Sequence, residues 1–202
     1  MTPPLTPRQL SLYGADGRRK YLTIAEGGRV LDTAASFDLP TAALACLLTC
    51  SGCRLSEALE LTRFQLDLEA CAVIFRTLKR RQLHYRAVPI PQDLMEMLLV
   101  VAESRPGESR LWGWCRQTGW RRVKAVMAAA GIEGPHACPK GLRHAYGVAC
   151  ALSQVDPDLT RRMLGHTKLE TTAIYQQVIG PEAQAILTRL WARLRQESAP
   201  ER

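Results

Sequence analysis

The chain has 202 residues, 47% of them hydrophobic and 23% charged, which is sufficient for one substantial globular domain or two small ones. No apolar run approaches the roughly 18 residues that span a bilayer, and the N-terminal MTPPLTPRQL lacks the charged and apolar regions of a signal peptide. A formal net charge of +8 favours phosphate-rich partners, above all nucleic acid, with an acidic membrane surface as the competing partner. We therefore expect a cytoplasmic, nucleoid-associated protein.

The N-terminal half is predicted to contain helices and one hairpin. Prolines and early glycines predict a flexible arm over residues 1–20, with the folded domain over 21–202. Helices are predicted over 21–37, entered through Thr23, over 41–51, ended by Gly52, and over 54–62. Residues 72–77 and 85–90 alternate in β-favouring residues around a basic middle, which predicts an antiparallel hairpin.

The C-terminal half is predicted to be helical. Pro91 opens a helix, residues 105–114 have the composition of turns, and the later helices follow in short succession. Their predicted ranges are 92–104, 117–130, 140–153, 158–164, 170–178 and 182–196. The fold class is therefore mainly α with a small antiparallel β-sheet (α+β).

The seven cysteines do not form a regular framework. Their odd number and irregular spacing argue against a closed set of disulfides. Cys50 and Cys53 have the spacing of half a zinc site, but a structural zinc needs four ligands and no second pair follows. Cys46 and Cys50 lie four apart in an apolar run, which favours burial in a helix. We expect neither a metal nor another cofactor.

The stretch LGHTKLETTAIYQQV places Tyr175 nine residues after His166. Taken alone it reads as core packing, because Ile174 and Val178 share a helical face. Two other stretches change that interpretation: LTCSGCRLSEALELT contains Arg54, and PKGLRHAYGVA contains Arg143. A phenol with a pKa near 10 attacks a phosphodiester only with assistance. Arginines can hold the negative charge of the transition state, and a further cation must protonate the leaving oxygen.

Together these stretches resemble the catalytic domain of the tyrosine recombinase (phage integrase) family. That family shows a TG-x-R-x-SE-x-x-x-L box, a basic β-hairpin, an H-x-L-R-H box, and an LGH followed by a tyrosine. All four blocks occur here in that order, between about Tyr21 and Arg195. The resemblance implies a DNA strand-exchange enzyme that needs neither a metal nor ATP.

The resemblance also implies roles for individual residues. Tyr175 would be the nucleophile that forms a 3′-phosphotyrosyl link. Arg54 and Arg143 would grip the scissile phosphate, and His166 would hydrogen-bond it. Lys79 is the only lysine of the hairpin stretch and would be the general acid. Arg81 stands at the commoner distance from the end of the hairpin, but an arginine is a poor proton donor.

One position departs from the family pattern. Lys140 stands where most relatives have a histidine, three residues before Arg143. A lysine with an ordinary pKa near 10.4 is protonated at neutral pH. We expect Lys140 to stabilise phosphate charge and to shuttle protons, and it could accept the tyrosine proton only if burial lowered its pKa. His144 is expected to have a supporting role.

Several basic residues are predicted to contact DNA phosphates, giving salt-sensitive binding with little sequence choice. They are Arg76, Arg80, Arg81, Arg121, Arg122 and Lys124. His84 and His136 belong to no motif and are expected at the surface. The tryptophans at 112, 114 and 120 are expected in the core.

The implied function is site-specific recombination of double-stranded DNA. The alternatives are type IB topoisomerase-like relaxation and a non-catalytic DNA-binding regulator or accessory protein. Relatives usually carry a separate core-binding domain, and only about 20 to 35 residues precede the first matched helix, too few for one. We therefore expect either a catalytic domain alone or a helper protein that supplies the core-binding domain.

The apolar face of 182–196 predicts docking onto a neighbour in a homotetramer on DNA, or packing on its own domain. Without DNA we expect a monomer.

Overall fold

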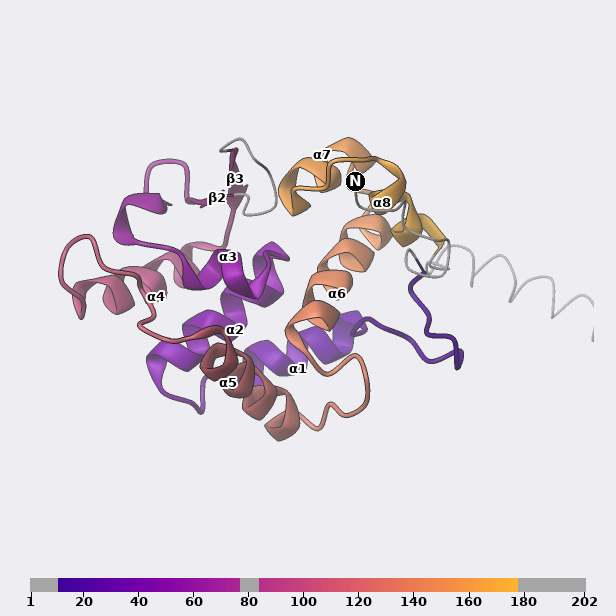
Figure 1. Ribbon diagram of the computed structural model, residues 1–202, viewed down its shortest axis with the longest axis horizontal. Coiled ribbons are helices and arrows are strands. Elements are labelled where there is room, and N and C mark those ends of the chain that lie inside the picture. The colour runs from indigo at the N-terminus through magenta and orange to yellow at the C-terminus, as the bar shows by residue number, and fades with distance from the viewer. Residues whose placement is uncertain (1–10, 77–83, 178–202) are drawn as a thin grey trace, which may run out of the picture.

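The computed structural model describes residues 11–76 and 84–177 of the chain (Figure 1). Most of this part is helical, with one small sheet. The helices are α1 (Ile24–Ala34), α2 (Leu39–Ser51), α3 (Leu55–Leu59), η2 (Arg63–Gln65), α4 (Gln92–Glu103), α5 (Arg116–Ala129), α6 (Pro139–Leu152), α7 (Pro157–Leu164), α8 (Glu170–Ala173) and η3 (Ile174–Gln177). The strands are β1 (Leu66–Asp67), β2 (Ala72–Arg76) and β3 (Tyr85–Pro89). The predicted fold class is confirmed.

Side-chain caps set the starts of the first two helices. At α1, the Thr23 hydroxyl accepts from the backbone N–H of Glu26, whose carboxylate accepts from the backbone N–H of Thr23. At α2, the Asp38 carboxylate accepts from the backbone N–H of Thr41, with Pro40 in the first turn. This cap explains why α2 begins two residues before its predicted start.

The sheet is antiparallel in the order β1-β2-β3. Val73 lies opposite Val88, and Phe75 lies opposite Arg86. Val73, Phe75 and Val88 are buried, so one face of the hairpin contributes to the core. The strand β1 was not predicted, because two residues are too few to show an alternating pattern.

The buried apolar residues form two cores, and α6 contributes to both. The larger one is built by α1 to α5, one face of the sheet and part of α6. The smaller one contains Leu12, Val148, Leu164, Ile174 and Tyr175. In Figure 1, α7 and α8 lie at the far end of α6 from α5. The helix α6 therefore joins the larger bundle to the segment that carries Tyr175.

Some predictions need correction. Within the predicted arm, residues 11–20 are not loose, because Leu12 is buried in the smaller core and Tyr13 forms a β-bridge with Arg19. The predicted helix over 170–178 tightens to a 3₁₀ turn at Ile174, which lets Ile174 and Tyr175 both be buried. The predicted helix over 182–196 lies outside the described residues.

Two aromatic side chains outside the motifs were also mispredicted. His136 is buried, not at the surface, and it approaches the carboxylate of Glu26. Trp120 is exposed, and Lys124 lies over its ring, whereas Trp112 is in the core as predicted. Among the helices of the described part, none is long and apolar enough to cross a membrane.

Candidate active site

The turn after α2 places Arg54. The helix ends at Gly52, whose φ of 59° is in the left-handed region. A Cβ at Gly52 would come within 2.6 Å of the Tyr146 ring and 2.9 Å of a Leu164 methyl, so this turn requires glycine. Arg54 then stands at the N-cap position of α3, with about a quarter of its side chain exposed.

Arg143 joins three segments of the chain. It lies in α6 and is buried, and its guanidinium donates to the carbonyl oxygen of Gly52 at 2.8 Å and to that of Leu164 at 2.7 Å. Burial, and next the charge of Arg54, lower the pKa of Arg143 to about 10. Arg143 therefore stays charged at neutral pH and holds the ends of α2 and α7 together.

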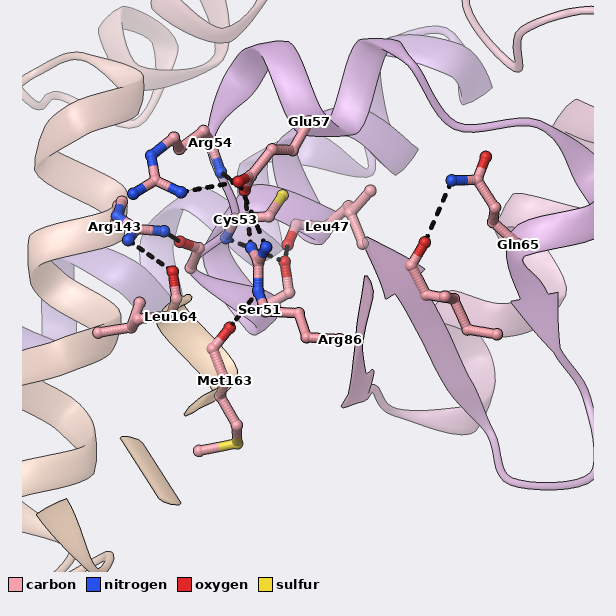
Figure 2. Close-up of polar contacts among 12 residues, drawn as sticks. Leu47, Ser51, Cys53, Arg54, Glu57, Gln65, Arg86, Arg143, Met163 and Leu164 are labelled. Carbon is pink, nitrogen blue, oxygen red and sulfur yellow. Dashed lines mark hydrogen bonds and ion pairs between the residues drawn. The ribbon is translucent and has the colours of Figure 1, made fainter. Parts of the chain in front are cut away.

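A fully buried carboxylate lies between two arginines (Figure 2). Glu57 accepts from the Arg54 guanidinium at 2.7 Å and from the Arg86 guanidinium at 2.7 Å, and it also accepts from the backbone N–H of Arg54. Burial alone would raise the pKa of Glu57, but the Arg86 hydrogen bond and the two arginine charges outweigh it and hold the pKa below its usual value. Glu57 therefore holds both the guanidinium and the backbone of Arg54 in place.

Arg86 is a site residue that the sequence interpretation missed. From β3 it reaches Glu57, and its Nε donates to the carbonyl oxygen of Met163 at 2.7 Å (Figure 2). The signal was available, because Arg86 and Val88 alternate onto the same face of β3 and Val88 is buried. Charged side chains are rarely buried without a partner, so an inward-facing Arg86 predicts an acceptor in the interior, which the structure shows to be Glu57.

Two histidines contact Tyr175. The Nδ1 of His144 lies 3.3 Å from the Tyr175 hydroxyl oxygen, and the His166 ring stacks on the tyrosine ring with centroids 6.3 Å apart. The Nδ1 of His166 is hydrogen-bonded to the Thr172 hydroxyl at 2.9 Å, which fixes the imidazole. The structure thus brings the predicted residues His166 and Tyr175 together and adds His144 to them.

Burial and cationic neighbours keep both histidines neutral. Burial, followed by the charges of Arg143 and Arg54, lowers the pKa of His166 to about 3. Burial, followed by the charges of Lys140 and Arg143, lowers the pKa of His144 to about 4. The phenol of Tyr175 is also stabilised in its neutral form, because burial raises its pKa to about 12 although Arg143 opposes the rise.

Gly147 provides the seat for the tyrosine ring. It lies one helical turn after Arg143 in α6, and a Cβ there would overlap the Tyr175 ring. The tyrosine is only 2% exposed in this position. The approach of the ring to the α6 backbone therefore depends on the missing side chain.

Gly147→Ala is expected to displace the Tyr175 ring while leaving the fold intact. Alanine favours the helix by about 0.5–1 kcal/mol, which partly offsets the lost ring contact, so the unfolding midpoint in urea should change little. The ring shift should slow any reaction of the Tyr175 hydroxyl by roughly 10²-fold. Gly28→Ala in α1 is the matched control, since a Cβ there meets nothing within 4 Å. Equal reactivity of the two variants would contradict the assigned seat.

The other predicted site residues lie apart from this centre or outside the described part. Lys140 is exposed on α6 near His144, and Arg76 is exposed at the end of β2. Lys79, Arg80 and Arg81 lie outside the described residues. The remaining predicted DNA contacts are all on α5, well away from α7 in Figure 1: Arg121, Arg122 and Lys124.

The residues of α5 differ in how they are held. Arg122 pairs with Asp38 at 2.8 Å and stacks over the Trp114 ring, whereas Arg121 is exposed and Lys124 lies over Trp120.

Within residues 11–76 and 84–177, no group of three or more metal-ligating side chains lies close enough together to hold a metal ion.

The fold is that of a tyrosine recombinase catalytic domain. The crystal structure of XerA recombinase superposes with a TM-score of 0.70 at 21% identity, covering 99% of this chain and 68% of that one. The catalytic domain of bacteriophage HP1 integrase gives a TM-score of 0.63 at 22% identity, covering 84% of this chain and 93% of that one.

The sequence match extends over most of the chain. Residues 20–179 match the Phage integrase family, and the chain belongs to that family. Tyrosine recombinase XerA of Thermococcus kodakarensis is 29% identical over 188 residues, which are 88% of this chain and 62% of the relative. Tyrosine recombinase XerD of Vibrio vulnificus is 29% identical over 145 residues, 65% of this chain and 47% of the relative. The chain thus spans about half to three-fifths of the length of these relatives.

Proposed function

We propose that the chain is a site-specific recombinase that cleaves and rejoins duplex DNA through a covalent link to Tyr175. The observation that carries this proposal is the convergence of Arg54, Arg143, His166 and Tyr175, which come from four separate segments, where the ends of α2 and α7 meet α6. Two arginines beside a phenol provide the charge that a pentacoordinate phosphate transition state requires.

Each residue has a chemical task in this proposal. Arg54 and Arg143 hold the non-bridging oxygens of the phosphate, and the neutral His166 hydrogen-bonds the same group. The Tyr175 oxygen attacks phosphorus and displaces the 5′ oxygen of the next nucleotide. Lys79 of the hairpin protonates that oxygen, because a lysine can give up a proton and an arginine effectively cannot.

The DNA would be held by basic residues outside the reacting centre. Arg76, Arg80 and Arg81 of the hairpin and Arg121, Arg122 and Lys124 of α5 would contact phosphates. Two related structures are described as XerH bound to difH substrate, and another as the Tn1549 transposon integrase in complex with transposon right end DNA, which supports DNA as the substrate. Assembly into a homotetramer on DNA, and a helper protein, remain part of the proposal.

Covalent trapping tests this function directly. Nicked duplex fragments from the replicon that carries the gene are incubated with the protein and separated on a denaturing gel. The wild-type chain should give a DNA-shifted band, and Tyr175→Phe should give none while still binding the same DNA in a low-salt gel shift. An equally strong band in both proteins would contradict Tyr175 as nucleophile.

A DNA-binding regulator is the second candidate. It is favoured by the burial of Tyr175, since residues around the ring must shift before a phosphate reaches its hydroxyl. Binding of replicon DNA with no wild-type adduct on any nicked fragment would support this candidate over the recombinase.

Lys140→Ala tests whether the positive charge of Lys140 contributes to the reaction. If the lysine stabilises phosphate charge from the rim of the site, its loss should slow adduct formation by about 10-fold and weaken DNA binding in a salt-dependent way. Lys140→Arg, which keeps the charge, should retain most of the rate. A loss of no more than about twofold in Lys140→Ala would remove Lys140 from the machinery.

A further inference from the structure

The proposed reaction needs a group that takes the proton of Tyr175. Lys140 occupies the position where the family pattern has a histidine, and it is exposed on α6. In the part of the chain that the structure describes, Lys140 forms no hydrogen bond to the Tyr175 hydroxyl. The acceptor of the phenol proton must lie within hydrogen-bond reach of that hydroxyl.

The polar groups around Tyr175 point to His144. Its Nδ1 is 3.3 Å from the tyrosine oxygen, whereas the Nδ1 of His166 is hydrogen-bonded to Thr172 and the ring of His166 stacks on the tyrosine ring. A separation of 3.3 Å is long for such a hydrogen bond, and catalytic hydrogen bonds commonly shorten when the substrate binds.

We propose that Nδ1 of His144 is the proton acceptor for Tyr175 in DNA cleavage and the donor that returns the proton in rejoining. This inference rests on the proposed function. In cleavage the phenol O–H bond breaks, its proton moves to Nδ1, the phenol oxygen bonds to phosphorus, and the bond from phosphorus to the 5′ oxygen breaks. The 5′ oxygen takes a proton from the general acid. Rejoining reverses each transfer, so no proton is gained or lost over the cycle.

The surroundings of His144 keep its lone pair available. Burial lowers the pKa of the His144 ring most, and the positive charges of Lys140 and Arg143 from α6 and of Lys20 from the N-terminal segment lower it further. Among the described residues, Tyr175 from η3 and the neutral His166 also lie beside it. An imidazole with a pKa of about 4 is unprotonated at pH 7.

The low basicity of His144 determines when the proton moves. A phenol with a pKa of about 12 does not ionise in the resting protein. As its oxygen bonds to phosphorus, the acidity of the phenol proton rises steeply, and transfer to a nearby neutral imidazole becomes favourable. The resting site therefore holds an unreactive phenol, and the proton transfer accompanies the attack.

The helix α6 fixes the geometry of this pair. It carries the phosphate ligand Arg143 next to His144, and one turn later Gly147 seats the tyrosine ring. The ring contact at Gly147 and the hydrogen bond at His144 both position the same tyrosine side chain. One rigid helix thus presents phosphate ligand, proton acceptor and nucleophile seat together.

The first test does not require DNA. Nitrogen-15 NMR of the whole chain with labelled histidine reports which ring nitrogen carries the proton. At pH 7 we expect Nδ1 of His144 to be unprotonated and Nε2 protonated, with the Nδ1 signal shifting in Tyr175→Phe. A proton on Nδ1 would make His144 a hydrogen-bond donor to the tyrosine and would overturn the inference.

The second test uses nicked replicon DNA with sulfur in place of the bridging 5′ oxygen. A thiolate leaves without being protonated, so the rate no longer depends on the general acid. The wild-type adduct rate should be nearly constant between about pH 5 and 8, because the acceptor is unprotonated throughout. His144→Ala should be slower by roughly 10²- to 10⁴-fold and should speed up about tenfold per pH unit, since the phenol must then ionise unaided.

Two further variants separate proton acceptance from positioning. His144→Asn can still hydrogen-bond the hydroxyl but cannot take up its proton, so it should be as slow as His144→Ala. A fluorinated tyrosine at position 175, which ionises more readily, should restore much of the rate of either variant. If His144→Asn keeps the wild-type rate and pH profile, the inference fails while the recombinase remains. If the wild-type chain forms no adduct, the proposed function fails and the inference with it.

Discussion

Arg143→Lys is expected to reduce covalent adduct formation by about 10³-fold, the size of effect seen when a transition-state ligand for phosphate or an oxyanion is removed. Because this variant keeps the positive charge, the loss of rate measures the contribution of the guanidinium geometry. A lysine is a point charge and cannot bind two carbonyl oxygens and a phosphate in the plane of a guanidinium. The carbonyl groups of Gly52 and Leu164 would then compete with the phosphate for one ammonium group.

The adduct assay needs a folding measurement beside it. Thermal unfolding of Arg143→Lys should remain cooperative, with a modest loss of stability from two weakened buried hydrogen bonds. Arg63→Lys is the matched control, because Arg63 is exposed in η2 and belongs to neither the arginine network nor the predicted DNA contacts. A folded Arg143→Lys within about tenfold of the wild-type rate would show that Arg143 is structural only.

Glu57→Gln is expected to lower the free energy of unfolding by about 3–5 kcal/mol, because removing one partner of a buried ion pair leaves the other charge uncompensated. Arg86 would keep its buried guanidinium with no carboxylate beside it, and Arg54 would lose the group that holds it. Glu60→Gln is the matched control, since Glu60 pairs with Arg110 at the surface and should contribute no more than about 1 kcal/mol. Urea unfolding of the three proteins measures both differences.

The effect of pH on Glu57 has a definite sign. The folded pKa of Glu57 lies below its unfolded value, which is about 4.3. Its contribution to stability is therefore fully present above that unfolded value and is lost as the pH falls through the folded pKa. The difference between wild type and Glu57→Gln should be constant from about pH 6 to 8 and should shrink in acid. A difference that grew in acid would contradict the assigned ion pair.

Local chemistry made much of the fold predictable from sequence. The capping residue Thr23 and the terminating Gly52 mark helix ends because they act on backbone groups within a few residues. The strand β1 and the 3₁₀ turn at Ile174 depend instead on what the rest of the chain packs against them. Sequence pattern does not encode that packing over so short a stretch.

The candidate site likewise combines residues that the sequence identifies with contacts that only the fold shows. Arg54, Arg143, His166 and Tyr175 each stand in a recognisable motif, so their chemistry could be inferred before their positions were known. The pairings of Arg86 with Glu57 and of His144 with Tyr175 could not, since residues 29 and 31 positions apart meet only after the chain has folded. The alternation in β3 showed that Arg86 faced inward, but only the fold shows which carboxylate it meets.

Tyr175 has two roles, as part of the smaller apolar core and as the proposed nucleophile. Tyr175 is one of five buried residues there, so the side chain proposed to attack DNA is also part of what keeps Leu12 and Val148 dry. Opening this core so that a phosphate reaches the Tyr175 hydroxyl would expose apolar groups that now pack around the ring, and the free energy of that opening would be added to the barrier of the chemical step. A DNA contact that stabilised the opened core would lower that barrier without touching the reacting atoms. A change that stabilises the packing around residue 175 would therefore be expected to slow strand cleavage, and a change that weakens the packing would be expected to speed it.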